Sequence, residues 1–381
     1  MGRYKSVNSS RLERWLGWHN VAALSTAMRG APRWYGPPIA VHGVPGRVFV
    51  ANDGEFFGDL RAGYETNAFD RAHSLLHRFR RAMRRASAAQ AVTLNAGFAS
   101  LSDLIANMTT AGQRREMLFR KSGPAASIVG GTHSLWGLSD VPAAGANASA
   151  APGGDAPTDA TTGAYLFANP TGGDTLHFIN AYVSSSVALH TVLLYDRIFQ
   201  VNKTMASTAT QSVTGVPTRY QSSTAGAADY AAGNFAFVEV GVTNLSATAH
   251  DWTVCRYRNQ AGTDAQSFPS MTGNSGAVAR RLDHPLMSWF MPLAAGDTGV
   301  MDLDQMQCSA SVAAGVINFV VGHPIAWLPC PLANLMTAID GVGTALNLVR
   351  VFDDAALAML LVNAPTTAQV AVNGQFTLCA G

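Results

Sequence analysis

The C-terminal two thirds of this chain consist of short apolar segments, often alternating with polar residues and separated by Gly, Ser, Asn or Pro. A period of two is typical of β-strands, whose successive side chains point to opposite faces of a sheet. The segments follow one another without clear helices between them, which predicts an antiparallel β-sandwich or a jelly-roll-like fold. They are 176–183, 188–201, 235–243, 252–258, 316–321, 346–352, 358–362 and 368–379.

Local turn signals refine this prediction. Asn373-Gly374 lies between two apolar stretches near the end of the chain, and Asp53-Gly54 lies between two others near its start. Both dipeptides are typical of the tight turn of a β-hairpin, because Gly adopts a positive φ without strain. Residues 331–339 are compatible with one short helix between strands.

The N-terminal part predicts helices as well. From Thr66 to Ser87 apolar residues recur at spacings of three and four, which indicates a long amphipathic helix. A second, shorter helix is expected to begin at Ser100, with Asp103 three residues later as in a capping box.

Charge is distributed unevenly along the chain. Residues 1–121 hold 18 Lys and Arg against 8 Asp and Glu, a net +10, and residues 122–381 hold 8 against 16, a net −8. The basic face of the long predicted helix is formed by Arg71, Arg78, Arg81 and Arg85. We expect these arginines to dock on an acidic protein surface, such as another copy of the chain. Aromatic residues are not interleaved with them as in many nucleic-acid-binding surfaces, so contact with nucleic acid is the less favoured reading.

The segment 141–163 is rich in Ala, Gly and Pro and has no large apolar residue after Val141. Such a segment cannot build a core, so it is expected to be a linker or an extended arm that another copy or another protein of an assembly holds in place. With 381 residues the chain is long enough for two cores. We therefore expect a mainly β chain with a smaller, helix-containing basic part at 1–140, a linker at 141–163 and a sandwich-like part at 164–381.

No catalytic motif is found. The segment 273–277 places its second Gly wrongly for a nucleophile elbow, and 341–346 lacks the third Gly of a dinucleotide fingerprint. His73 and His77 would share a helix face but have arginine neighbours, which disfavours a metal pair. Asp283-His284 is interpreted as a polar loop with an Arg–Asp contact. The sequence thus assigns no catalytic, cofactor-binding or metal-binding residue, and we expect the protein not to be an enzyme and to need no cofactor.

The four cysteines, which are spread over more than a hundred residues without a C-x-x-C pair, are Cys255, Cys308, Cys330 and Cys379. We expect free thiols with no bound metal. The sequence has neither an apolar N-terminal leader nor a run of about 18 apolar residues, so no membrane contact is expected and the chain would be made in a cytoplasm.

Two segments carry a resemblance to a known group of proteins. Residues 257–263 read Y-x-N-Q-x-G-T, and residues 292–300 read P-L-x-A-G-D-x-G-V. In this order, and followed by residues 309–311 and 321–326, they resemble strand-and-turn motifs of structural proteins in the virions of tailed bacteriophages. The resemblance spans about 235–329. It implies a β-rich subunit that assembles in many copies with itself and other virion proteins, in a capsid-associated, decoration, collar or tail position.

Two other classes of function stay open. A β-sandwich can bind glycans or receptors through exposed aromatic side chains, for which Trp252, Trp289 and Trp327 are the candidates, although each lies in an apolar run that favours a core position. A glycan-acting enzyme is less favoured, because the adjacent Asp353 and Asp354 would point to opposite faces of a strand.

Overall fold

The computed structural model describes residues 5–6, 48–50, 56–58, 97–124, 127–342 and 348–381. The chain divides into two compact units, Met1–Val92 and Thr93–Gly381. In the first unit β1 (Lys5–Ser6), β2 (Val48–Val50) and β3 (Phe56–Gly58) form an antiparallel sheet in that order. The pairing of β2 with β3 confirms the predicted hairpin, whose turn lies outside the described residues.

The second unit is built on two long strands. β8 (His190–Thr204) and β16 (Val316–Cys330) are 15 residues each and pair antiparallel from end to end. They are the middle of a five-stranded sheet with the order β10-β16-β8-β19-β5. Its other strands are β10 (Phe235–Val240), β19 (Leu357–Val362) and β5 (His133–Ser134).

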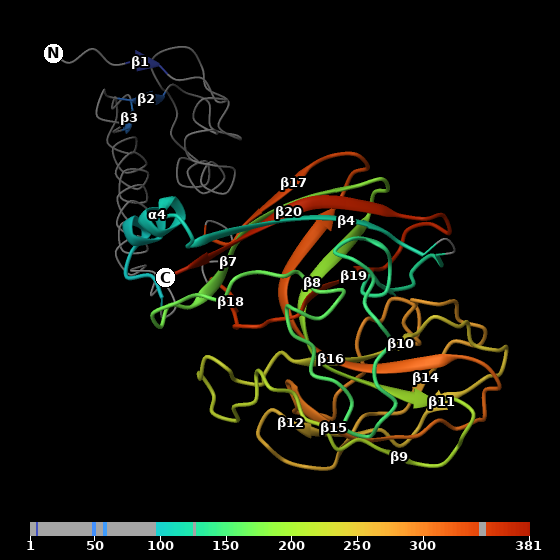
Figure 1. The fold of residues 1–381 in the computed structure, drawn as a ribbon. Helices are drawn as coiled ribbons and strands as arrows, with labels where there is room; N and C mark the ends of the chain where they lie inside the picture. The colour runs from blue at the N-terminus through green and yellow to red at the C-terminus, as the bar shows by residue number, and fades with distance from the viewer. Residues whose placement is uncertain (1–4, 7–47, 51–55, 59–96, 125–126, 343–347) are drawn as a thin grey trace, which may run out of the picture. The chain divides into compact units, whose positions relative to one another are not determined.

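One half of this central sheet packs on a six-stranded sheet with the order β17-β7-β20-β4-β6 and with β18 paired to β7. Figure 1 shows β20, β4 and β7 of this sheet beside β8 and β16. The core between the two sheets is apolar and contains Val192 and Leu328 from the long strands and Phe376 from β20. The strands are β4 (Arg114–Ser122), β6 (Asp140–Val141), β7 (Leu176–Ser185), β17 (Thr337–Asp340), β18 (Arg350–Val351) and β20 (Ala371–Ala380).

The other half of the central sheet packs on a four-stranded sheet with the order β13-β12-β15-β9. Here Val201 and Phe319 of the long strands meet Tyr257 and Leu303. The strands are β9 (Gln211–Ser212), β12 (Arg256–Asn259), β13 (Gln266–Ser267) and β15 (Val300–Met306), and β11 (Asp251–Trp252) pairs with β14 (Met271–Thr272) beside them. All pairings between these strands are antiparallel, so the prediction of a mainly β, sandwich-like chain is confirmed.

The helix α4 (Leu101–Thr109) confirms the predicted short helix. Ser100 is its N-cap, with the hydroxyl accepting from the backbone N–H of Asp103 at 3.1 Å, and the Asp103 carboxylate accepts from the N–H of Ala99 at 2.9 Å. Both bonds satisfy donors that a helix start otherwise leaves unpaired. No helix in the described parts of the chain is long and apolar enough to cross a membrane.

The segment 141–163 is hydrogen-bonded to β8 of the same chain. Asp155 exchanges two backbone hydrogen bonds with Gln200 of β8, at 2.8 and 2.9 Å, and the N–H of Asn202 donates to the carbonyl of Ser149 at 2.8 Å. The indole of Trp136 donates to the carbonyl of Ala146. Backbone hydrogen bonds along β8 order this segment without a core of its own, and α4 and β4, expected in the N-terminal part, belong to the same unit as the sandwiches.

The hairpin turn predicted at Asn373-Gly374 and the short helix predicted at 331–339 are wrong. Asn373 and Gly374 lie inside β20, paired with β4 on one side and β7 on the other, and form no hairpin turn. Residues 331–339 form no helix: a turn at 332–334 leads into β17, which begins at Thr337. The strand predicted at 316–321 is confirmed but is longer than predicted, because β16 continues through Pro324 to Cys330.

Candidate functional site

The outer face of the six-stranded sheet is covered at one end and bare at the other. In β4 the side chains alternate, so that Met117 and Phe119 enter the core while Leu118 points outward. Helix α4 covers one end through Leu104, which packs with Ile179 of β7 and other apolar residues. Beyond the helix the face is a shallow groove of about 680 Å³.

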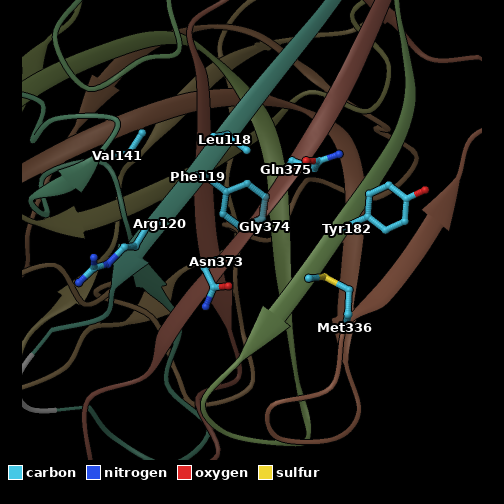
Figure 2. Close-up of a pocket in the computed structure, with 9 residues that line it drawn as sticks. All are labelled: Leu118, Phe119, Arg120, Val141, Tyr182, Met336, Asn373, Gly374 and Gln375. Atoms are coloured by element: carbon cyan, nitrogen blue, oxygen red, sulfur yellow. The ribbon is translucent and has the colours of Figure 1, made fainter.

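Four strands contribute to this groove (Figure 2). The groove is lined by Leu118, Phe119 and Arg120 of β4, Val141 of β6, Tyr182 of β7, Asn373, Gly374 and Gln375 of β20, and by Met336 just before β17. The apolar members are well exposed, with 67% of Leu118, 54% of Met336 and 51% of Val141 accessible. Large apolar side chains gathered at one exposed site are typical of a protein–protein contact.

Gly374 shapes the floor of the groove. A Cβ at this position would lie 1.9 Å from the carbonyl oxygen of Tyr182 and 2.7 Å from the ring of Phe119, so no other residue fits. The space that a side chain would need is already filled by the carbonyl of Tyr182 and the ring of Phe119, beside which Gly374 lies in Figure 2. The close approach of β7 to β20 thus requires a glycine at this position.

The charged side chains at the groove carry opposite signs. Arg120 lies 4.0 Å from Asp140, and its side chain is 76% exposed. An exposed pair at this distance contributes little to stability. The lining residues offer apolar contact and amide hydrogen bonds rather than an acid and a base placed for proton transfer.

Two buried ion pairs in the described part of the chain join an arginine to a carboxylate. Arg197 contacts Glu239 at 2.6 Å, and Arg219 contacts Asp196 at 2.8 Å, with none of the four side chains more than 6% exposed. Burial opposes the charged form of Glu239, but the charge of Arg197 and its hydrogen bonds outweigh it and lower the pKa of this carboxyl. The first pair joins β8 to β10, and the second joins β8 to the connection between β9 and β10. Both pairs are buried and closed to a substrate.

Asp283 is the centre of a buried cluster. The expected Arg–Asp contact is wrong: one carboxylate oxygen of Asp283 accepts from His250 and from the indole of Trp252, both at 2.8 Å, and the other accepts from the N–H of Asn274. His284 also lies inside, where its Nε2 accepts from the backbone N–H of Val238 at 2.9 Å. Asp283 accepts three hydrogen bonds from protein groups, and both Asp283 and His284 are buried, so we interpret this pair as structural.

The two segments with the virion resemblance form one hydrogen-bonded unit. Asp297 accepts from the hydroxyl of Tyr257 at 2.5 Å and from the amide of Asn259 at 2.8 Å. The side chain of Gln260 accepts from the N–H groups of Thr298 and Gly299. The polar residues of both motifs therefore serve to join two turns at the ends of β12 and β15.

The arginines expected to dock a partner, Arg71, Arg78, Arg81 and Arg85, lie outside the described residues, as do His73 and His77. Trp252 is buried at 1% exposure, as its apolar surroundings predicted, whereas Trp327 is 42% exposed and meets Trp289 edge-on at 5.0 Å. Asp353 and Asp354 lie in a turn after β18 and not in a strand.

The four cysteines are buried free thiols. Within the described parts of the chain no three His, Cys, Asp or Glu side chains are grouped so that they could hold a metal ion. Nothing in the sequence pattern singled out the groove, because its residues come from separate strands and share no motif. An alternating strand with a large apolar residue on its outer side, such as Leu118, is the one signal that could have indicated it.

Comparison with known proteins gives no relative: no family model, no curated protein and no solved structure matches the chain.

Proposed function

We propose that this protein is a structural subunit of a tailed-phage particle, in which it assembles in many copies in a capsid-associated, decoration, collar or tail position. The observation that carries the proposal is the apolar groove on the outer face of the six-stranded sheet, which α4 leaves bare. The resemblance of residues 257–263 and 292–300 to virion proteins supports a phage particle as the assembly. The polar side chains of these two segments bond to each other and join two turns.

A second copy of the chain is the partner that fits the groove. Leu118, Val141 and Met336 supply exposed apolar area that a facing copy can cover. Arg120 and Asp140 have opposite charges, so two copies related by a twofold axis can place each arginine near the partner's aspartate.

The groove is tested with the Leu118→Glu variant. A charge at its centre should leave the isolated chain folded and weaken self-association by about tenfold or more, since burying an unpaired carboxylate is costly. Val242→Glu is the control, because Val242 is also more than half exposed and lies outside the groove. Sedimentation velocity over a range of concentrations measures the association.

Unchanged association of Leu118→Glu, or equal loss in both variants, would exclude the groove as the contact. The particle itself is tested by mass spectrometry and electron microscopy of purified virions from a lysate that expresses this chain. A chain that is absent from every particle and monomeric at all concentrations would contradict a structural role.

A carbohydrate- or receptor-binding module is the second candidate. The exposed Trp327 next to Trp289 favours it, because a sugar ring stacks on such a face. Binding to a glycan array that is lost in Trp327→Ala and kept in Leu118→Glu would support this function in place of assembly.

A further inference from the structure

A second pocket, of about 410 Å³, lies in the second unit away from the groove. It is lined by His177 of β7, His323 of β16, Arg350 of β18, and Tyr220 and Tyr230 from the connection between β9 and β10, among others. Because Arg350 and His177 are paired residues of neighbouring strands, they lie side by side. The pocket therefore brings a cation, two imidazoles and two phenols together from four parts of the chain.

The protein fixes the tautomer of both histidines. Nδ1 of His323 donates to the side-chain oxygen of Asn234 at 2.8 Å, and the amide nitrogen of Asn234 is itself engaged with two backbone carbonyls. Nδ1 of His177 donates to the carbonyl of Thr175 at 3.2 Å. Burial lowers the pKa of each imidazole to about 4. Both rings are thus neutral near neutral pH, and Nε2 of each is a hydrogen-bond acceptor.

Among the described residues Arg350 has no acidic partner in an ion pair. Its guanidinium lies over the ring of Phe352, 4.2 Å from the centroid, and its Nε is buried without a hydrogen bond. A buried donor on a cation that lacks an acceptor costs free energy, which an anionic ligand would recover.

The backbone around the pocket is specially shaped. Tyr220 has a φ of +54°, which is uncommon for a residue other than Gly, and its ring stacks on His323 at 3.8 Å with an interplanar angle of 9°. In β16 the register shifts on both sides of His323, between Val321 and Gly322 and again between Pro324 and Ala326. Bulges of this kind redirect side chains and are frequent beside binding sites, as is local strain.

We propose that this pocket binds a small monocarboxylate with hydroxyl groups near the carboxylate, the chemistry of a sugar acid. The fork of Arg350 matches a carboxylate, and the two imidazoles accept from hydroxyl donors. Arg350 is the single charged residue among those that line the pocket, so a monoanion balances it and a phosphate dianion does not. This activity is separate from assembly through the groove.

Calorimetric titration of the full chain near pH 7 tests the proposal with glucuronate, glucose and glucose 6-phosphate as probes. We expect glucuronate to bind at least about tenfold more tightly than the other two. Arg350→Gln should reduce the affinity for glucuronate by about tenfold or more, whereas Arg256→Gln, the same change at an exposed site in β12, should not. Thermal unfolding verifies that the variants fold, and Arg350→Lys, which keeps the charge but loses the fork, provides a second test.

The histidines are tested with His323→Phe, which keeps a ring beside Tyr220 but removes the acceptor. It should weaken binding of glucuronate and leave binding of cyclohexanecarboxylate, which has no hydroxyl group, unchanged. Absence of glucuronate binding at about 10 mM would overturn the proposal, since such a Kd corresponds to less than about 3 kcal/mol. Equal affinity for glucose 6-phosphate, or equal losses in Arg350→Gln and Arg256→Gln, would do so as well.

Discussion

Arg197 and Glu239 show how single residues connect the strands of the central sheet. Their ion pair of 2.6 Å joins β8 to β10, and both side chains are at most 1% exposed. Gln200 accepts from the Nε of Arg197, and Asn318 donates to Glu239 from β16. Because every polar group of the pair is satisfied, the interior tolerates both charges, but each depends on the other.

Removing one partner of the pair should therefore lower the free energy of unfolding far more than removing both. We expect Arg197→Met to lower the free energy of unfolding by about 3–5 kcal/mol, because Glu239 is left buried without its cation. The double variant Arg197→Met/Glu239→Leu should recover most of that loss. Urea unfolding measures the free energy of unfolding of the single and the double variant. Arg114→Met is the control, because the exposed Arg114–Glu116 pair should contribute about 1 kcal/mol or less. A double variant as unstable as the single one would contradict this account.

His250 should make part of the stability depend on pH. Burial opposes its charged form, but the hydrogen bond and charge of Asp283 outweigh burial and raise the pKa of His250 above its ordinary 6.5. A raised folded-state pKa means that this stabilisation is complete below about pH 6.5 and is lost as the pH rises through the folded-state value.

We therefore expect His250→Gln to destabilise the protein more at about pH 5.5 than at about pH 9. The comparison uses urea unfolding of both proteins at each pH. Burial lowers the pKa of His284 and His323 to about 4, which makes stability change with pH in the opposite direction. Both proteins contain these two histidines, so their effect cancels in the difference between wild type and variant. A loss that is the same at both pH values would exclude a charged His250 in the folded protein.

At the scale of elements, the packing of β20 against β7 depends on Gly374. A Cβ on Gly374 would lie 1.9 Å from the carbonyl oxygen of Tyr182 in β7. Gly374→Ala should push β7 away and lower the free energy of unfolding by about 2–3 kcal/mol. Asn373→Ala, at the exposed neighbour, should change it by about 0.5 kcal/mol or less. Similar small effects at both positions would mean that the two strands are not packed so closely.

The same dipeptide shows what the sequence could and could not predict. Asn373-Gly374 has the composition of a hairpin turn, and local chemistry alone favours that turn. Gly374 is instead required by the close approach of β7, which is distant in sequence. Periodicity found β7, β8, β10 and β19 because each alternates or is uniformly apolar, but pairing between distant strands leaves no local signal.

Prolines limited the prediction of β16 in the same way. The apolar run at 316–321 is followed by Pro324, which cannot donate to a sheet and usually marks the end of a strand. The strand continues because its register shifts between Pro324 and Ala326. His323, beside this bulge, could not be assigned to a pocket from the sequence, since the groups it meets are about a hundred residues away in Tyr220 and Asn234.

At the scale of the whole molecule, the charge asymmetry between residues 1–121 and 122–381 should make assembly sensitive to salt. Changing Arg71, Arg78, Arg81 and Arg85 to Gln should leave the chain folded and reduce its incorporation into particles. Wild-type assembly should weaken as salt approaches 1 M, where charges are screened beyond about 3 Å.

Particle yield over a salt series measures this effect. A variant with Arg114, Arg256 and Arg258 changed to Gln is the control, because it removes charge from described strands of the second unit. Normal incorporation of the fourfold variant at every salt concentration would show that this basic face is merely solvated.

The position of β20 has a consequence for synthesis on the ribosome. Among the described strands β4 pairs with β6 and β20 alone, and β20 joins it to β7 and hence to the rest of its sheet. β20 emerges roughly 250 residues after β4, which at about 5–20 residues per second is a delay of roughly 10–50 seconds. During that time the nascent chain carries β4 with one bare edge, a template for mispairing with neighbouring polypeptides. A ribosome that stalls before residue 371 would release a chain in which β4 is still separated from the sheet.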